Sequence, residues 1–320
     1  MRRVVDLVQA YVARLFHMHV RSFLGRVNNY GIQQSNRLHH RWSVAGASQI
    51  CCCALTGPIG NTGLGYEIVK ALYKSSESYE IIIGCRTIAK GEDAKSAIER
   101  EVPQSTSTLS VQQADLCSDE SLTQAITAIT SHYGRLDVLI NNGGGGFDAE
   151  MARGELSARE ALNATWDVTV SGTHVLTQLA VPLLLRSRAP RVLFMTSGTS
   201  SLGESERLDN ETQRRLNGAP GAGWPKEEQV MPLTGYRAAK TGLNMLMREW
   251  ARMLRNDGVR VWAVSPGFLA TGLGGVGVDR LKAMGAQEPS VGGEFVRDMV
   301  EGKRDTDVGK VIRRDMTQPW

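Results

Sequence analysis

The chain has 320 residues, of which 42% belong to the hydrophobic set and 22% are charged, a composition that suits one large globular domain. Its formal net charge is +4, but residues 1–48 carry seven arginines and a single acid, Asp6, so residues 49–320 have a net charge of −2. That balance, without a basic stripe interleaved with aromatic residues, excludes charge-driven nucleic-acid binding. No apolar run reaches the roughly 18–20 residues of a spanning helix, so no membrane partner is expected.

The number and spacing of the cysteines indicate whether the protein resides in a reducing or an oxidising cellular compartment. Cys51, Cys52 and Cys53 are adjacent and cannot form an orderly disulfide framework, and no Cys/His spacing typical of a zinc site is present. We therefore expect reduced thiols, no metal and a cytoplasmic protein.

Residues 1–48 are predicted to be an N-terminal extension outside the folded domain. Apolar residues recur there at helical spacing between arginines (Val4, Val8, Leu15), as in a mitochondrial transit peptide, but no clear cleavage signal follows. Two interpretations stay open. The segment is either a targeting sequence, which would place the protein in mitochondria, or a disordered or wrongly added extension.

From residue 49 to residue 320, short apolar runs alternate with longer helical stretches. This alternation predicts a single-domain α/β Rossmann fold with a doubly wound parallel sheet. The expected strands are Ile50–Leu55, Glu80–Cys85, Leu109–Gln113, Asp137–Ile140, Arg191–Thr196 and Val259–Val264. No internal repeat or second composition regime appears, so one catalytic domain is expected.

The first strand leads into a glycine-rich turn that contains Gly57, Gly63 and Gly65. Leu64, inside the turn, begins an apolar stripe at four-residue spacing, so a helix starts there. A strand, a glycine-rich turn and a helix are the elements that bind the pyrophosphate of a dinucleotide, because backbone amides at the helix N-terminus face the phosphates. The alternative is a plain turn.

The end of the second strand bears on which nicotinamide cofactor binds. An acid there would suit the 2′-hydroxyl of NAD, whereas an arginine suits the 2′-phosphate of NADP. Arg86 stands at this position, and no acid does. We therefore predict NADP(H), the alternative for Arg86 being an exposed loop residue.

Three residues are candidates for catalysis. Ser197 follows the fifth strand, and Tyr236 and Lys240 lie four residues apart on one face of a predicted helix. A phenol titrates near pH ~10, and a neighbouring ammonium would lower that pKa and make the phenol a useful proton donor. Taken alone, such a pair is more often coincidental.

Between serine and tyrosine, residues 203–231 form a long polar insertion, which is either a functional lid or an inert loop.

Together these motifs resemble the short-chain dehydrogenase/reductase superfamily over about residues 49–312. The glycine turn, Asn-Asn-x-Gly, Ser, Tyr-x-x-x-Lys and Pro-Gly-x-x-x-Thr follow in the family's order on successive strand ends. The long insertion is similar to that of NADPH-dependent carbonyl reductases.

The resemblance implies a role for each matching residue. Tyr236 would donate a proton to the substrate carbonyl, Ser197 would hydrogen-bond the same oxygen, and Lys240 would lower the tyrosine pKa and bind the nicotinamide ribose. Further contacts to the cofactor are implied for Gly57, Gly63, Leu64, Gly65, Asp115, Asn141, Gly143, Pro266 and Thr271.

Three departures from the family pattern are visible. The glycine turn is two residues longer than usual. Thr169 occupies the place where an asparagine commonly supports a proton relay. The insertion is expected to cover helices that other members use to oligomerise, which favours a monomer.

The resulting hypothesis is an NADPH-dependent reductase that converts a ketone or aldehyde of a small or medium hydrophobic compound to an alcohol. The alternative is a non-catalytic NADPH-sensing regulator on the same fold, which would have no use for Tyr236. A sugar-nucleotide epimerase or dehydratase would need a larger substrate domain than the 49 residues after Thr271 provide.

Overall fold

The structure is a computed structural model, and it describes residues 49–55, 63–226, 233–273 and 277–320. The predicted extension at residues 1–48 and the contact predicted for Gly57 lie outside these residues. None of the helices in the described part of the chain is long and apolar enough to cross a membrane.

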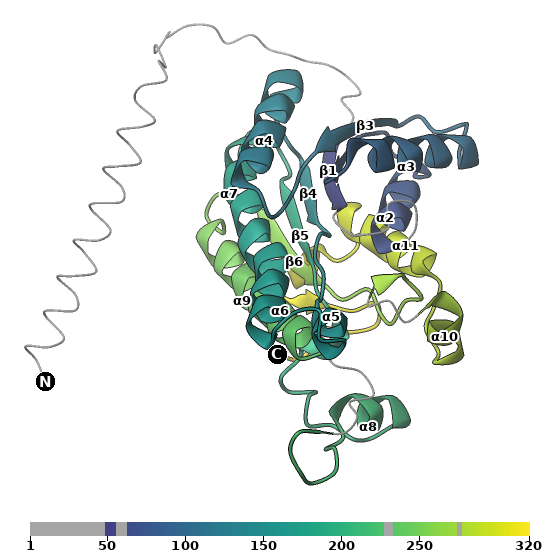
Figure 1. Cartoon of the computed structure of the whole chain (residues 1–320). Helices are drawn as coiled ribbons and strands as arrows, with labels where there is room; N and C mark the ends of the chain where they lie inside the picture. The colour runs from purple at the N-terminus through teal and green to yellow at the C-terminus, as the bar shows by residue number, and fades with distance from the viewer. Residues whose placement is uncertain (1–48, 56–62, 227–232, 274–276) are drawn as a thin grey trace, which may run out of the picture. The chain divides into compact units, whose positions relative to one another are not determined.

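Seven parallel strands form one sheet in the order β3-β2-β1-β4-β5-β6-β7 (Figure 1). The strands are β1 (Gln49–Leu55), β2 (Tyr79–Cys85), β3 (Thr108–Gln113), β4 (Val138–Asn141), β5 (Arg191–Met195), β6 (Arg260–Val264) and β7 (Val311–Ile312). The predicted Rossmann fold is confirmed, and the six predicted strands agree with the structure to within one residue at each end. The two-residue strand β7 was not predicted.

Helices cover both faces of the sheet (Figure 1). One face carries α4 (Asp119–Tyr133), α7 (Gly172–Leu184) and α9 (Thr234–Met253), and the other carries α2 (Leu64–Tyr73), α3 (Ile88–Glu101) and α11 (Pro289–Val300). Each face has its own apolar core, with Phe194 and Met247 in the first and Ile83 and Trp262 in the second. Because both faces are covered, the central strands β4, β5 and β6 are predominantly apolar and buried, whereas the edge strand β3 is more polar.

The remaining elements surround the carboxyl ends of the strands or connect the layers. They are α5 (Asp148–Ala152), α6 (Ala158–Trp166), a π-helical turn η1 (Asp167–Ser171), a 3-10 turn η2 (Gly198–Ser200), α8 (Glu211–Asn217), α10 (Val278–Ala283) and a 3-10 turn η4 (Asp305–Asp307). The predicted insertion contains α8, a helix with no buried residue of its own.

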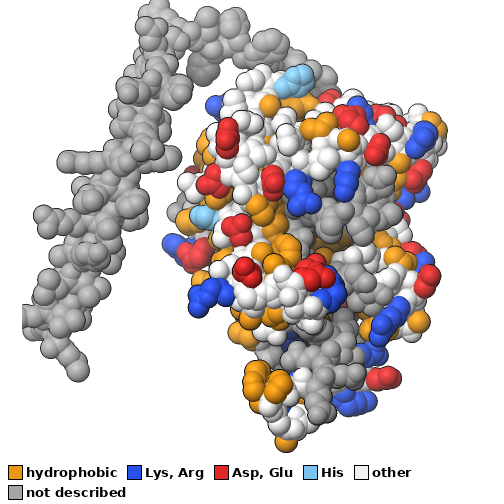
Figure 2. Space-filling model, viewed as in Figure 1, with side chains coloured by type: hydrophobic (Ala, Val, Ile, Leu, Met, Phe, Trp, Pro, Cys, Tyr) orange, Lys and Arg blue, Asp and Glu red, His pale blue; other side chains and the backbone are white. Residues whose placement is uncertain are grey.

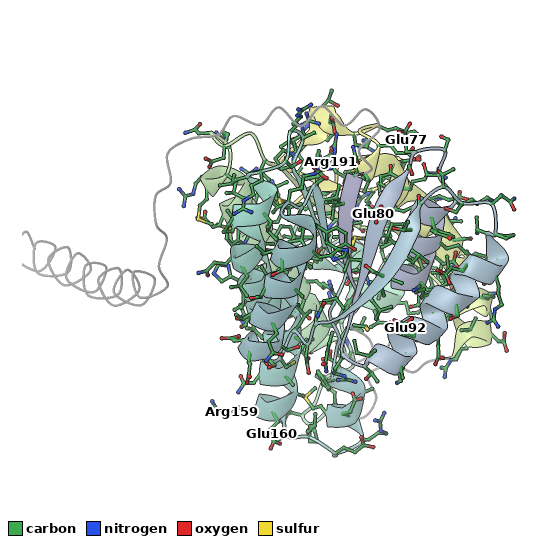
Figure 3. All side chains as sticks on the ribbon, turned by 90° about the horizontal axis from the view of Figure 1, so that it is seen from above. Glu77, Glu80, Glu92, Arg159, Glu160 and Arg191 are labelled. Carbon is green, nitrogen blue, oxygen red and sulfur yellow. The ribbon has the colours of Figure 1, made fainter. Side chains whose placement is uncertain are left out.

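The two ends of the sheet differ in what they carry. Figure 3 shows Arg191, which begins β5, at the same end as Glu77 and Glu80, whereas Arg159 and Glu160 of α6 lie at the opposite end. The strand order reverses between β1 and β4. In open α/β sheets, ligands bind outside the carboxyl ends of the strands at such a reversal, so a site is expected there.

Candidate active site

A cavity of about 1290 Å³ opens at the carboxyl ends of the strands. Residues at or just after the ends of β2, β4, β5 and β6 line it, among them Cys85, Asn142, Met195 and Ser265. A pocket for a drug-sized ligand has about 300–1,000 Å³, so this volume accommodates a dinucleotide together with a second molecule.

The catalytic candidates converge on this cavity. Ser197, Tyr236 and Lys240 all line it, although thirty-nine residues of sequence separate the serine from the tyrosine. Helix α9 presents Tyr236 and Lys240 one turn apart, with the lysine Nζ 5.9 Å from the centre of the tyrosine ring. Ser197 lies two residues after the end of β5 and caps the turn η2, where its Oγ accepts a hydrogen bond of 3.2 Å from the Thr199 amide.

Lys240 is almost fully buried, at 5% exposure. Its Nζ donates a hydrogen bond of 2.7 Å to the backbone carbonyl of Met195 at the end of β5. Burial lowers the pKa of this lysine to about 8, because an ammonium group loses hydration in the protein interior. The hydrogen bond to Met195 fixes the lysine against the strand that delivers Ser197.

The phenol of Tyr236 behaves differently from the expectation. Its pKa is raised by burial, and a hydrogen bond with Ser197 offsets this only in part. The sequence predicts a lowering by Lys240, but in the structure burial sets the direction of the shift, and the lowering contribution comes from Ser197 rather than from Lys240. The lysine shares the same desolvated pocket, and its Nζ is committed to the Met195 carbonyl.

The predicted cofactor residues divide into two sets. Gly63, Leu64, Gly65, Arg86, Pro266 and Thr271 line the cavity with Tyr236 and Lys240. Asp115, Asn141 and Gly143 are not among the described residues that line it. The neighbouring Asn142 and Gly144 line it instead.

The chain's own groups fit a dinucleotide at this edge. Gly63 adopts φ +107°, a conformation that favours glycine, and caps the N-terminus of α2; a Cβ added there would lie 4.0 Å from the Cβ of Thr271. Asn141 is buried, donates to Thr177 and has no partner for Oδ1 in the described part of the chain. A buried acceptor without a partner is costly, and a bound ligand or water is the usual explanation.

Thr169, at the predicted relay position, is fully buried in the π-helical turn η1. Its Oγ1 donates a hydrogen bond of 3.3 Å to the carbonyl of Gly145. A Cβ added to Gly144 would lie 3.4 Å from this hydroxyl and 3.1 Å from the Lys240 Nζ, so the hydroxyl and the ammonium flank the same glycine. A side chain at position 144 would therefore press against the lysine ammonium and displace it by a few tenths of an ångström.

Asp148 is a residue of this site that the motifs do not reveal. Its buried carboxylate accepts hydrogen bonds from the backbone amides of Gly235 (2.7 Å) and Tyr236 (2.9 Å) at the start of α9. The carboxylate therefore accepts hydrogen bonds from two amides at the N-terminus of the helix that carries the tyrosine. Its negative charge also lies beside the positive end of the helix dipole, which is stabilising. It stands eighty-eight residues from Tyr236, and no local signal connects the two.

Comparisons with known proteins agree with this geometry. Residues 53–207 match the family described as short chain dehydrogenase, and residues 226–291 match the one described as Enoyl-(Acyl carrier protein) reductase. The short-chain dehydrogenase/reductase eupG of Phoma sp. is 43% identical over 279 residues, covering 84% of this chain and 98% of that protein. The short-chain dehydrogenase/reductase tropE of Talaromyces stipitatus is 44% identical over 256 residues, covering 80% and 93%.

Solved structures share the fold. An NADPH-bound carbonyl reductase from chicken fatty liver superposes with a TM-score of 0.63 at 17% identity, covering 85% of this chain and 98% of that one. A variant of actinorhodin polyketide ketoreductase with NADPH gives a TM-score of 0.60 at 19% identity, covering 83% and 95%. At these identities the likeness concerns the fold.

The doubly wound sheet and the site at its switch point define a Rossmann-fold oxidoreductase of the nicotinamide-dependent class. More particularly, the chain belongs to the short-chain dehydrogenase/reductase family.

Proposed function

We propose that the protein is an NADPH-dependent reductase that converts a ketone or aldehyde carbonyl of a small or medium hydrophobic compound to an alcohol. The observation that carries this proposal is the meeting of Ser197, Tyr236 and Lys240 in one cavity. The same cavity includes Arg86 and the N-terminus of α2, so a cofactor and a substrate have room side by side.

Each of the three side chains has a distinct task. Tyr236 donates the proton to the carbonyl oxygen, and its raised pKa keeps the phenol protonated at neutral pH. Ser197 donates a hydrogen bond to the same oxygen and orients it. Lys240 holds the cofactor ribose and, when protonated, stabilises the phenolate that proton transfer leaves behind. Bound NADPH supplies the hydride that adds to the carbonyl carbon.

Arg86 supports NADPH over NADH. It follows β2 directly, it is exposed, and it lines the cavity, so its guanidinium is available to a 2′-phosphate. No acid stands at the end of β2 to bind a 2′-hydroxyl.

The wall after β6 supports a hydrophobic substrate. Its lining residues are predominantly apolar and come from the segment between β6 and the end of α10: Phe268, Leu269, Leu273, Leu281 and Met284. The facing residues of α8 are polar except for Leu216. A substrate with an apolar body and few polar groups fits a cavity of this composition.

The test is NADPH oxidation by the purified protein with a panel of ketones, aldehydes and quinones, repeated with NADH. We expect turnover of at least one hydrophobic carbonyl compound with NADPH, and slower turnover with NADH. Tight NADPH binding without turnover of any compound would favour the sensing regulator instead.

A further inference from the structure

The segment 313–320 lies against the loop that begins at the catalytic serine. Gln318 is buried, at 2% exposure, and its Nε2 donates to the Ser197 carbonyl at 3.2 Å and to Ser200 Oγ at 3.4 Å. The Gly203 amide donates to the Trp320 carbonyl at 2.6 Å. The Gln318 side chain and the Trp320 carbonyl therefore bind residues 197–204, the serine loop, near its two ends.

Arg313 fixes the orientation of the Gln318 amide. Its Nε donates a hydrogen bond of 2.9 Å to Gln318 Oε1, which leaves the amide nitrogen facing Ser197. The same guanidinium pairs with both carboxylate oxygens of Glu204 and donates to the Gly198 carbonyl at 3.3 Å. Because Nε donates to Gln318 and both terminal nitrogens donate to Glu204, the guanidinium is held in place, and Gln318 has one favourable arrangement.

The serine loop is also bonded to helix α9. Ser200 Oγ donates to the Ser197 carbonyl at 2.6 Å and accepts from Asn244 Nδ2 at 2.9 Å, while Thr196 Oγ1 donates to Asn244 Oδ1 at 2.6 Å. Asn244 stands one turn after Lys240 on the helix that carries both proton-handling residues. Thr196, Ser200, Asn244 and Gln318 are all buried, so the network is shielded from competing water.

We propose that Gln318 is a positioning residue for Ser197 in carbonyl reduction. This inference rests on the function proposed above. The backbone of Ser197 sets where its Oγ points, and the Ser197 carbonyl is held from one side by Ser200 and from the other by Gln318. Without Gln318, the loop loses its bond to the segment at the serine itself, and the hydroxyl no longer meets the carbonyl oxygen in the reactive geometry.

Gln318→Glu is the sharpest variant. It keeps the shape and the acceptor for Arg313 but removes both N–H donors and places a carboxylate oxygen against the Ser197 carbonyl. We expect kcat for the best carbonyl substrate to fall by about tenfold to 100-fold, with unchanged NADPH affinity. Gln318→Met, which buries no charge, is the second variant should the first fold poorly, and the same loss is expected. Thr317→Ala, an exposed neighbour, should match the wild type.

A double-mutant cycle with Ser197→Ala separates positioning from general stability. If Gln318 acts through the serine, Gln318→Glu lowers single-turnover rates in the wild type and changes nothing further in Ser197→Ala. The same fold-loss in both backgrounds, or an unchanged kcat in Gln318→Glu, would overturn the proposal.

Amide hydrogen exchange tests the role of Gln318 without depending on the proposed function. A wild type that reduces no carbonyl compound would refute the proposed function. Exchange of the amides of residues 197–204 in Gln318→Met would then still decide whether Gln318 holds the loop, with faster exchange expected and unchanged exchange contradicting it.

Discussion

The Asp148 carboxylate accepts a hydrogen bond of 2.9 Å from the backbone amide of Tyr236, so the first residue of α5 directly holds the catalytic tyrosine. We predict that Asp148→Ala lowers kcat and also costs about 1–2 kcal/mol of stability, because a helix N-terminus loses its acceptor. Urea unfolding and steady-state kinetics measure the two effects. Ser118→Ala removes a comparable acceptor from α4 and should cost stability without lowering kcat. Equal kcat losses in both variants would contradict the special role of Asp148.

Tyr236→Phe removes only the phenolic hydroxyl. We expect turnover to fall by at least about 100-fold, because no other group described in the cavity combines a proton to donate with this position. NADPH affinity, measured by fluorescence titration, should stay close to that of the wild type. A variant that keeps most of its activity would refute the assignment of the proton donor.

Arg86→Asp tests the cofactor preference. Loss of a charge-assisted hydrogen bond to the 2′-phosphate, and repulsion by the new carboxylate, should reduce the ratio of kcat/KM with NADPH to that with NADH by about tenfold to 100-fold. Arg100→Asp makes the same charge change in α3, outside the cavity lining, and should leave the ratio unchanged. An unaltered ratio in Arg86→Asp would remove Arg86 from the phosphate site.

Lys240 should make stability depend on pH in the alkaline range. Its folded-state pKa of about 8 is below the ordinary value of 10.5, so the folded state binds this proton less well than the unfolded state. Below pH 8 the charged lysine is penalised on folding, and the penalty disappears as the pH rises from 8 to 10.5. Wild-type stability should therefore rise relative to Lys240→Met over this window, by up to roughly 3 kcal/mol. Denaturant unfolding at several pH values measures the difference, and a constant difference would show that burial does not perturb the lysine.

An ion pair at the opposite end of the sheet, away from the cavity, is expected to contribute to stability and not to catalysis. Arg191, labelled in Figure 3, is buried there and pairs with Asp305, which also pairs with Arg260. Asp305→Ala leaves a buried guanidinium without its carboxylate. The cost should be below the roughly 3–5 kcal/mol of a fully buried pair, because Asp305 is 35% exposed. Thermal unfolding should show the loss, whereas kcat of the folded enzyme should stay unchanged.

The same pair predicts acid sensitivity. Hydrogen bonding to Arg191 lowers the pKa of Asp305 below its ordinary 3.8. Its contribution is therefore present above pH 3.8 and is lost as the pH falls through the lowered value. The stability difference between wild type and Asp305→Ala should shrink over that acidic range.

The predicted monomer stays a prediction. In the described part of the insertion, α8 is held by Arg237, which donates to the Leu216 carbonyl and to Asn217 Oδ1, each at 3.0 Å. Trp166 of α6 and Met245 of α9 remain exposed.

Figure 2 shows acidic and basic side chains mixed over the face that it displays, in keeping with the small net charge of residues 49–320.

The sequence alone determined six of the seven strands, the helix that begins at Leu64 and the helix that pairs Tyr236 with Lys240. These features depend on apolar periodicity, on glycine at a turn and on a four-residue spacing, all of which are local properties of the chain. The carboxyl ends of parallel strands share one edge, so Ser197 and Arg86 could also be assigned to the same cavity from their positions alone.

Only the tertiary structure decided which groups hold those residues in place. Asp148 contacts Tyr236 across eighty-eight residues of sequence, and Gln318 contacts Ser197 across 121. Neither residue carries a periodic or motif signal. The role of each depends on a contact with a residue far away in the sequence, and not on the residues next to it in the chain. The upward shift of the Tyr236 pKa has the same origin, since burial is a property of the packed cavity and cannot be inferred from a four-residue spacing.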